Sequence, residues 1–123
     1  MAKKNKRELR KRIDSFRYAF RGIAYIFGTQ KNAWIHGIIA ILVILSGIIL
    51  SLNSFEWVLI TFAIGFVFAA EAFNTAIETW VDRISPGYDE KAGRTKDMAA
   101  AAVLIAAITA AVIGLIIFVP KLL

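Results

Sequence analysis

Several polar side chains interrupt an otherwise apolar stretch of the sequence, and their types suit acid–base or metal chemistry. The stretch is FAAEAFNTAIETWVDRI, residues 68–84. On a helix of 3.6 residues per turn, five of its residues fall within an arc of roughly 100°. We call these five residues the polar stripe: Glu71, Asn74, Thr75, Glu78 and Asp82.

The depth of the polar stripe in a membrane follows from where its helix begins. The preceding apolar run starts at Phe55, so Glu71 lies about 24 Å and Glu78 about 35 Å along the helix at 1.5 Å per residue. A hydrocarbon core of roughly 30 Å then places Glu71 just inside the membrane edge and Glu78 at the interface with water. Carboxylates inside a membrane are costly and usually serve function. Asp82 lies beyond that edge, where a structural charge is the simpler interpretation.

The residue types limit which reactions the polar stripe could catalyse. Glu71 can abstract a proton, and Glu78 can hold a divalent cation that is itself bound to phosphate oxygens. Lys96 and Asp97 enter the next apolar segment from the same side of the membrane, and a lysine can neutralise phosphate charge. The chain has no cysteine and one histidine, His36. This excludes thiol nucleophiles and argues against a histidine-rich metal site.

Three classes of function fit such a stripe. An ion-coupled carrier needs carboxylates that load and unload within the membrane. A lipid-modifying enzyme needs them at headgroup depth, where a lipid hydroxyl meets a soluble cosubstrate. An assembly subunit needs only a polar contact between helices. Carrier sites tend to lie near the membrane midplane, so the depth of the stripe favours the enzyme.

Three apolar segments have to position these residues. The apolar fraction of 59% exceeds the 45–50% typical of soluble domains. We predict an all-α membrane protein with one domain, residues 1–123, and helices at 34–52, 55–84 and 98–119, the second extending past the membrane edge. Residues 53–56 form a polar break, residues 85–97 a polar loop, and Pro120 ends the third helix.

The first 31 residues have a different character. Ten of the Lys and Arg residues precede Asn32, against only Glu8 and Asp14. Apolar residues recur there at steps of three and four, which predicts an amphipathic helix lying at the membrane surface. A basic arm beside a span meets anionic lipid headgroups more often than nucleic acid. The positive-inside rule then places the N-terminus and the 85–97 loop in the cytoplasm.

The third apolar segment contains a seam of small residues at every fourth position: Ala102, Ala106, Ala110 and Gly114. Small residues let helix backbones approach closely in lipid. The seam predicts tight packing within the protomer or between protomers. Three helices make only a small bundle, which favours oligomerisation.

The segments EAFNTAIETWVDRI and GRTKDMAAAAVLIA (93–106) closely resemble the small bacterial integral-membrane diacylglycerol kinase and undecaprenol kinase family. The match spans nearly the whole chain, and the pattern ExxNxxxExxxD with a downstream GRxKD is highly specific. The resemblance implies a multi-pass protein of the bacterial cell membrane. It implies a homotrimer whose active sites are shared between protomers at the cytoplasmic interface. There the γ-phosphate of ATP, with magnesium, is moved onto a lipid hydroxyl.

The resemblance also implies roles for individual residues. Glu71 matches the catalytic base, Asn74 the amide that positions the lipid hydroxyl, and Glu78 the metal-binding carboxylate. The positions that match nucleotide contacts are Lys11, Tyr18, Glu78, Gly87, Tyr88, Asp89, Lys96 and Asp97. Lys11 and Tyr18 match less securely than the others, and Gly87, Tyr88 and Asp89 match by loop position.

His36 is a departure from the family pattern. Members from Gram-negative bacteria carry a second metal-binding glutamate in the first span, where this chain has His36. Magnesium prefers oxygen ligands over imidazole. His36 is therefore a doubtful metal ligand, and contact with phosphate, with nucleotide or with a neighbouring helix all remain open. His36 and the ending IIFVPKLL resemble the branch from Gram-positive bacteria, whose members mainly phosphorylate undecaprenol.

The surroundings of Glu71 in the sequence favour the same lipid. Phe66, Phe68 and Phe73 are close to it, and few side chains there could bind an ester carbonyl. Each unsatisfied carbonyl would cost roughly 1–3 kcal/mol. We therefore expect undecaprenol as substrate, with diacylglycerol as the alternative.

Overall fold

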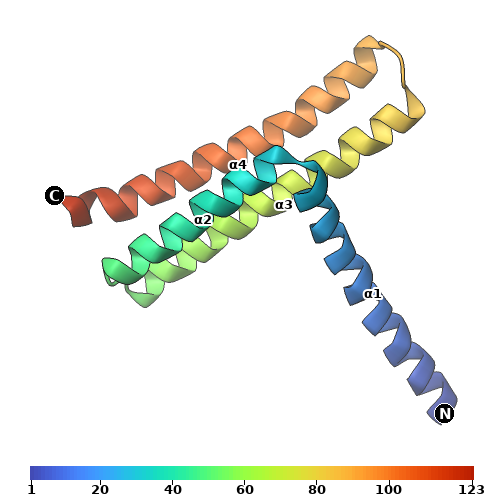
Figure 1. The fold of residues 1–123 in the computed structure, drawn as a ribbon, viewed down its shortest axis with the longest axis horizontal. Coiled ribbons are helices and arrows are strands. Elements are labelled where there is room, and N and C mark those ends of the chain that lie inside the picture. The colour runs from blue at the N-terminus through green and yellow to red at the C-terminus, as the bar shows by residue number, and fades with distance from the viewer. The chain divides into compact units, whose positions relative to one another are not determined.

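The computed structural model describes residues 1–123 as four α-helices and no strand (Figure 1). The helices are α1 (Ala2–Thr29), α2 (Lys31–Ile49), α3 (Ser54–Ile84) and α4 (Glu90–Leu122). Helices α2, α3 and α4 are each long and apolar enough to cross a membrane. The all-α class and three helices suited to span a membrane, as expected from the sequence, are confirmed.

The chain divides into two units, residues 1–31 and residues 32–123. The first unit is essentially α1, which has no buried residue. Most of its large apolar side chains, among them Leu9, Phe16 and Phe20, are exposed. An isolated helix of this kind has no core of its own, so its apolar residues need a membrane or a partner to cover them.

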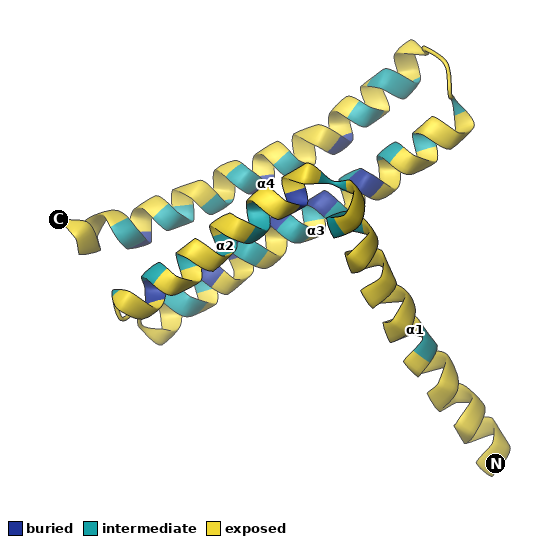
Figure 2. Ribbon diagram, in the orientation of Figure 1, coloured by how far each residue is buried: buried dark blue, intermediate teal, exposed yellow.

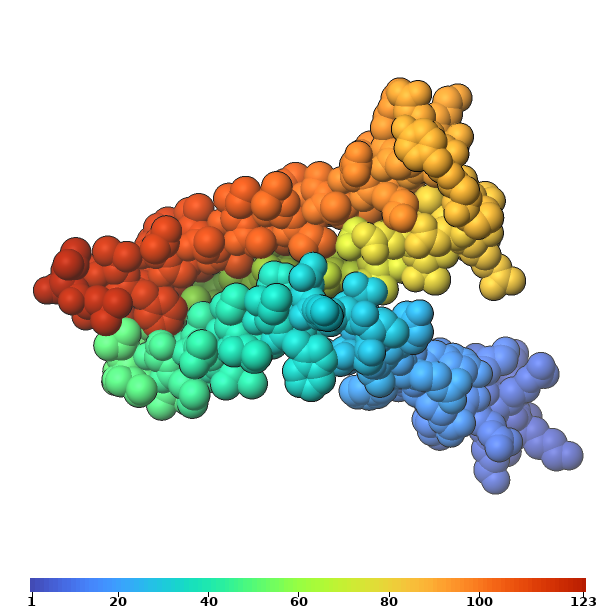
Figure 3. Space-filling model, turned by 45° about the horizontal axis from the view of Figure 1, so that its top comes forward, coloured from blue at the N-terminus to red at the C-terminus, as the bar shows by residue number.

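The second unit packs α2, α3 and α4 side by side, and α3 is visible in Figure 3 as a strip between the other two. The buried face of α3 runs at steps of three and four through Ile60, Ala63, Val67, Glu71 and Thr75. Part of the polar stripe therefore continues the same face that forms the apolar core (Figure 2).

The α2–α3 turn is closed by backbone hydrogen bonds. The amide of Leu52 donates to the carbonyl of Gly47 at 3.1 Å, and that of Ser51 donates to Ile48 at 3.3 Å. Ser51 has a φ of 54°, so this is a Schellman motif, with a serine where glycine is usual. A Cβ on Gly47 would lie 2.8 Å from both Leu52 and Trp57. Glycine is therefore needed for the turn to fold back onto α2.

The turn explains why α2 differs from the expected 34–52 segment. The helix begins at Lys31 and ends at Ile49, and the last apolar residues of the run form the turn instead. The polar break then starts α3 with a capping box. Glu56 donates its amide to Asn53 Oδ1 at 2.8 Å, and the amide of Asn53 donates to Glu56 Oε1 at 3.1 Å.

Helix α4 is longer at both ends than the expected 98–119 segment. It begins at Glu90 because the carboxylate of Asp89 accepts a hydrogen bond from the amide of Ala92 at 2.9 Å. Pro120 does not end it, because α4 continues to Leu122. Near a helix end a proline removes a single hydrogen bond, which the structure tolerates better there than in the middle.

The core at the α2–α3 turn consists of Leu52, Ile60 and Ile117. An ion pair between Lys121 and Glu56, at 3.2 Å, joins the ends of α4 and α3 beside it. The small-residue seam on α4 serves packing within the protomer in part. Ala106 is fully buried, Ala110 and Gly114 are half-buried, and Ala102 is exposed.

Candidate active site

The polar stripe runs along α3 from a buried end to an exposed end. Glu71 is 2% exposed and Thr75 is 4% exposed. Asn74 and Glu78 are half-buried, and Asp82 is exposed. The buried end therefore provides a carboxylate shielded from water, and the exposed end lies one turn from the polar loop that leads into α4.

Glu71 meets the only histidine of the chain. Nε2 of His36, on α2, lies 3.0 Å from Oε1 of Glu71. The separation is that of a hydrogen bond, but the angle is poor, and Oε1 is left without a well-aligned donor. Of the contacts that the sequence left open for His36, the structure shows one with a neighbouring helix.

Three buried polar atoms on adjacent turns of α3 have no hydrogen-bond partner in the chain: Glu71 Oε1, Asn74 Oδ1 and Thr75 Oγ1. Buried polar groups are nearly always satisfied, and leaving one unpaired costs about 1–3 kcal/mol. Such a cluster suits a ligand that brings its own donor, for example a hydroxyl. The sequence placed Thr75 in the stripe without a role, and only its burial beside Glu71 shows that it belongs to the site.

The amide of Asn74 faces Glu78, with Nδ2 lying 3.5 Å from Oε1. No three His, Asp or Glu side chains gather into a site that could enclose a metal ion. Magnesium is commonly held by one or two carboxylates while substrate phosphates and water complete its shell. Glu78, half-exposed toward the polar end of the stripe, fits that role. His36 does not, because it lies against Glu71 and offers nitrogen.

Lys96 is drawn to the stripe from α4, as expected, but its partner is Asp82. Its Nζ donates a hydrogen bond to Asp82 Oδ1 at 2.7 Å. Asp82 therefore orients the lysine and joins α3 to α4. An exposed ion pair of this kind contributes little to stability. Asp97, the next residue, is exposed.

The loop between α3 and α4 carries the other expected nucleotide contacts of this unit. Tyr88 is almost fully exposed, and Gly87 is exposed beside it. Asp89 has a structural role that the sequence did not reveal, because its side chain caps α4. Its remaining acceptor capacity is open to water or a ligand.

Lys11 and Tyr18 are seven residues apart on α1 and so lie on one face of it. Nζ of Lys11 lies 3.7 Å from Oε1 of Glu8. The guanidinium of Arg21 lies over the Tyr18 ring, 5.6 Å from its centroid. All four side chains are solvent-exposed.

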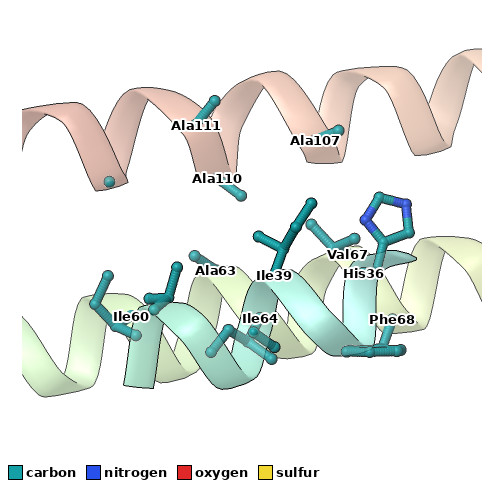
Figure 4. Close-up of a pocket in the computed structure, with 13 residues that line it drawn as sticks. His36, Ile39, Ile60, Ala63, Ile64, Val67, Phe68, Ala107, Ala110 and Ala111 are labelled. Carbon is teal, nitrogen blue, oxygen red and sulfur yellow. The ribbon is translucent and has the colours of Figure 1, made fainter. Parts of the chain in front are cut away.

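An apolar pocket of about 280 Å³ lies between α2, α3 and α4 (Figure 4). Aliphatic side chains from α2 and α3, such as Ile39 and Ile60, form one wall, and the small residues Ala107 and Ala110 of α4 form the other. His36 is the only polar residue in its lining. The pocket therefore adjoins the Glu71 end of the stripe.

The aromatic wall expected around Glu71 is present only in part. Phe68 lines the pocket, whereas Phe66 and Phe73 are exposed. Phe66 stacks on Phe62, with 5.9 Å between ring centroids. Phe73 is two positions and Phe66 five positions from Glu71, so on a helix both point to other faces. Nearness in sequence was therefore a poor guide to the wall.

The sequence is similar to those of several known proteins. A family model described as prokaryotic diacylglycerol kinase matches residues 17–118. An undecaprenol kinase of Bacillus subtilis is 39% identical over 121 residues, covering 98% of each chain. A diacylglycerol kinase of Synechocystis is 39% identical over 89% of this chain and 63% of its own. A diacylglycerol kinase of Escherichia coli K12 is 34% identical over 79% of this chain and 85% of its own.

Proposed function

The chain belongs to the prokaryotic diacylglycerol kinase family and is a lipid kinase, and we propose that it transfers the γ-phosphate of ATP to the hydroxyl of undecaprenol. The observation that carries the proposal is the buried carboxylate of Glu71. It adjoins unpartnered polar atoms on one side and an apolar pocket on the other. A base, a site for a hydroxyl and a place for an apolar chain therefore adjoin one another.

Glu71 acts as the general base. One of its oxygens accepts the hydroxyl proton of the lipid, and the lipid oxygen forms a bond to the γ-phosphorus. The bond from that phosphorus to the β–γ bridging oxygen breaks, and ADP leaves with the electron pair. Asn74 and Thr75, whose Oδ1 and Oγ1 atoms lie unpartnered beside Glu71, orient the hydroxyl. Positioning and charge stabilisation account for most of the catalysis of phosphoryl transfer.

The residues at the exposed end of the polar stripe neutralise the negative charge of the ATP phosphates. Glu78 would hold magnesium, which when bound neutralises the phosphates. Lys96 exchanges its bond to Asp82 for a phosphate oxygen, which a flexible ammonium group does readily. Asp97, the loop residues 87–89 and, on α1, Lys11 and Tyr18 are the remaining proposed nucleotide contacts.

The choice of undecaprenol over diacylglycerol rests on the pocket lining. A polyprenyl alcohol has a hydroxyl on a wholly apolar chain, whereas diacylglycerol brings two ester groups beside its hydroxyl. The lining has no donor for an ester carbonyl apart from His36, and each carbonyl left unpaired would cost about 1–3 kcal/mol. The Bacillus subtilis undecaprenol kinase, matched over nearly its full length, supports the same choice.

The remaining expectations concern the membrane and the assembly. The basic charge of residues 1–31 supports a cytoplasmic N-terminus, with the amphipathic α1 on the anionic membrane surface. Large apolar side chains of α2, α3 and α4 are exposed within a single chain. Lipid and neighbouring protomers would cover them, in keeping with a homotrimer whose sites are shared.

A lipid competition assay tests the function. The purified protein, in bilayers containing undecaprenol and diacylglycerol at equal mole fraction, receives labelled ATP and magnesium, and both phosphorylated products are counted. We expect both products, with undecaprenyl phosphate in excess. A higher kcat/KM for diacylglycerol would overturn the lipid assignment and leave the kinase chemistry standing. A carrier or an assembly subunit would phosphorylate neither lipid.

A further inference from the structure

We propose that His36 is a positioning residue, which holds the carboxylate of Glu71 in the orientation that accepts the lipid proton. The inference rests on the proposed function, because it assigns a role within the same site. The observation behind it is the 3.0 Å separation between His36 Nε2 and Glu71 Oε1, two groups on different helices. This ion pair links Glu71, on α3, to α2.

A carboxylate has more acceptor positions than one donor can use. With its proton on Nε2, the imidazole donates to Oε1 and leaves the remaining acceptor positions of Glu71 for the lipid hydroxyl. The present angle is poor, as is common for catalytic hydrogen bonds before substrate binds. A glutamate side chain has three rotatable bonds, and a donor on a separate helix removes most of that freedom.

The fold shows how His36 is held in place. Helix α2 meets α3 at the turn, where Leu52 and Trp57 pack against Gly47. His36 lies eleven residues before Gly47, about 16 Å along the helix, and makes a further, polar contact between α2 and α3. The apolar pocket lies between these two contacts, and His36 is at one end of it (Figure 4). The imidazole therefore ties the base to the wall of the pocket that would receive the lipid.

Three variants separate positioning from packing. His36→Leu removes the donor and keeps an apolar side chain. His36→Gln keeps an N–H donor at a similar reach. Ile35→Leu places the same leucine one residue earlier, at a site that is exposed and outside the pocket, and serves as the matched control. Each variant is purified in bilayers, its assembly is compared with the wild type by size exclusion, and kcat and KM are measured for ATP and for undecaprenol.

We expect His36→Leu to lower kcat by about 10- to 100-fold, the usual effect of removing a group that orients a reactive ligand. The KM for ATP should stay unchanged, because His36 contacts neither Glu78 nor Lys96. His36→Gln should recover most of the rate, and Ile35→Leu should match the wild type.

A double-mutant cycle gives the decisive readout. If His36 acts through Glu71, adding His36→Leu to Glu71→Gln should cost no further activity, since the base is already gone. An equal loss in both backgrounds would show a packing role and overturn the proposal. So would wild-type kcat in His36→Leu, or a His36→Gln variant as slow as His36→Leu. If the wild type transfers no phosphate, the kinase function itself fails, and this role fails with it.

Discussion

Replacing Glu71 by glutamine should separate activity from stability. The amide has nearly the shape of the carboxylate but cannot accept the hydroxyl proton. Loss of a general base typically lowers the rate by about 10²–10⁴, which is about 2.7–5.4 kcal/mol of activation free energy at 1.36 kcal/mol per tenfold change. We therefore expect kcat to fall by this factor.

The same substitution should leave the fold intact. Glu71 is 2% exposed, and Asn74 Oδ1 and Thr75 Oγ1 beside it are buried without donors. Glutamine removes a buried charge and introduces two N–H donors. Each acceptor that gains a partner recovers about 1–3 kcal/mol. The thermal unfolding midpoint of Glu71→Gln should thus equal or exceed that of the wild type.

The assay combines initial rates of label transfer from ATP with thermal unfolding in the same detergent. Glu56→Gln is the matched control, because it makes the same change on the same helix about 22 Å away. Glu56 accepts a hydrogen bond from the amide of Asn53 and pairs with Lys121. Its replacement should lower the unfolding midpoint while leaving the rate per folded molecule unchanged. Near-full turnover by a well-assembled Glu71→Gln protein would refute the role of Glu71 as base.

Four further substitutions probe the rest of the site and the fold. Glu78→Gln should weaken apparent magnesium and nucleotide affinity as well as rate, in titrations of both; unaltered affinities would show that Glu78 is not the metal ligand. Lys96→Met should raise the KM for ATP. Asp82→Asn should change this KM little, since the exposed ion pair between Asp82 and Lys96 contributes little to stability. Equal effects of the two substitutions would assign Lys96 a structural role. Gly47→Ala should lower the unfolding midpoint, because overpacking against Leu52 costs about 1–3 kcal/mol and the helix-propensity gain of alanine is only about 1 kcal/mol; an unchanged midpoint would show that the turn relaxes at no cost.

Much of this protein was readable from its sequence. Three long apolar segments predict three spanning helices, since hydrophobicity over about 20 residues is a local property. The polar stripe on α3 followed from helical periodicity, and the structure places all its residues on one helix with Glu71 buried near the end of an otherwise apolar face. The capping box at Asn53 and Glu56 could also be read from residue types at fixed spacing.

Only the tertiary structure decided which groups from different helices meet. The contact of His36 with Glu71, the choice of Asp82 as the partner of Lys96, and the apolar pocket all depend on how α2 and α4 are rotated and shifted against α3. A rotation of one residue, about 100° on a helix, would turn any of these side chains away. No local pattern encodes that rotation, because it results from packing many small side chains at once. The sequence thus determined which residue types are available for chemistry and on which face of a helix they lie, and the packing of α2, α3 and α4 determined which of them meet.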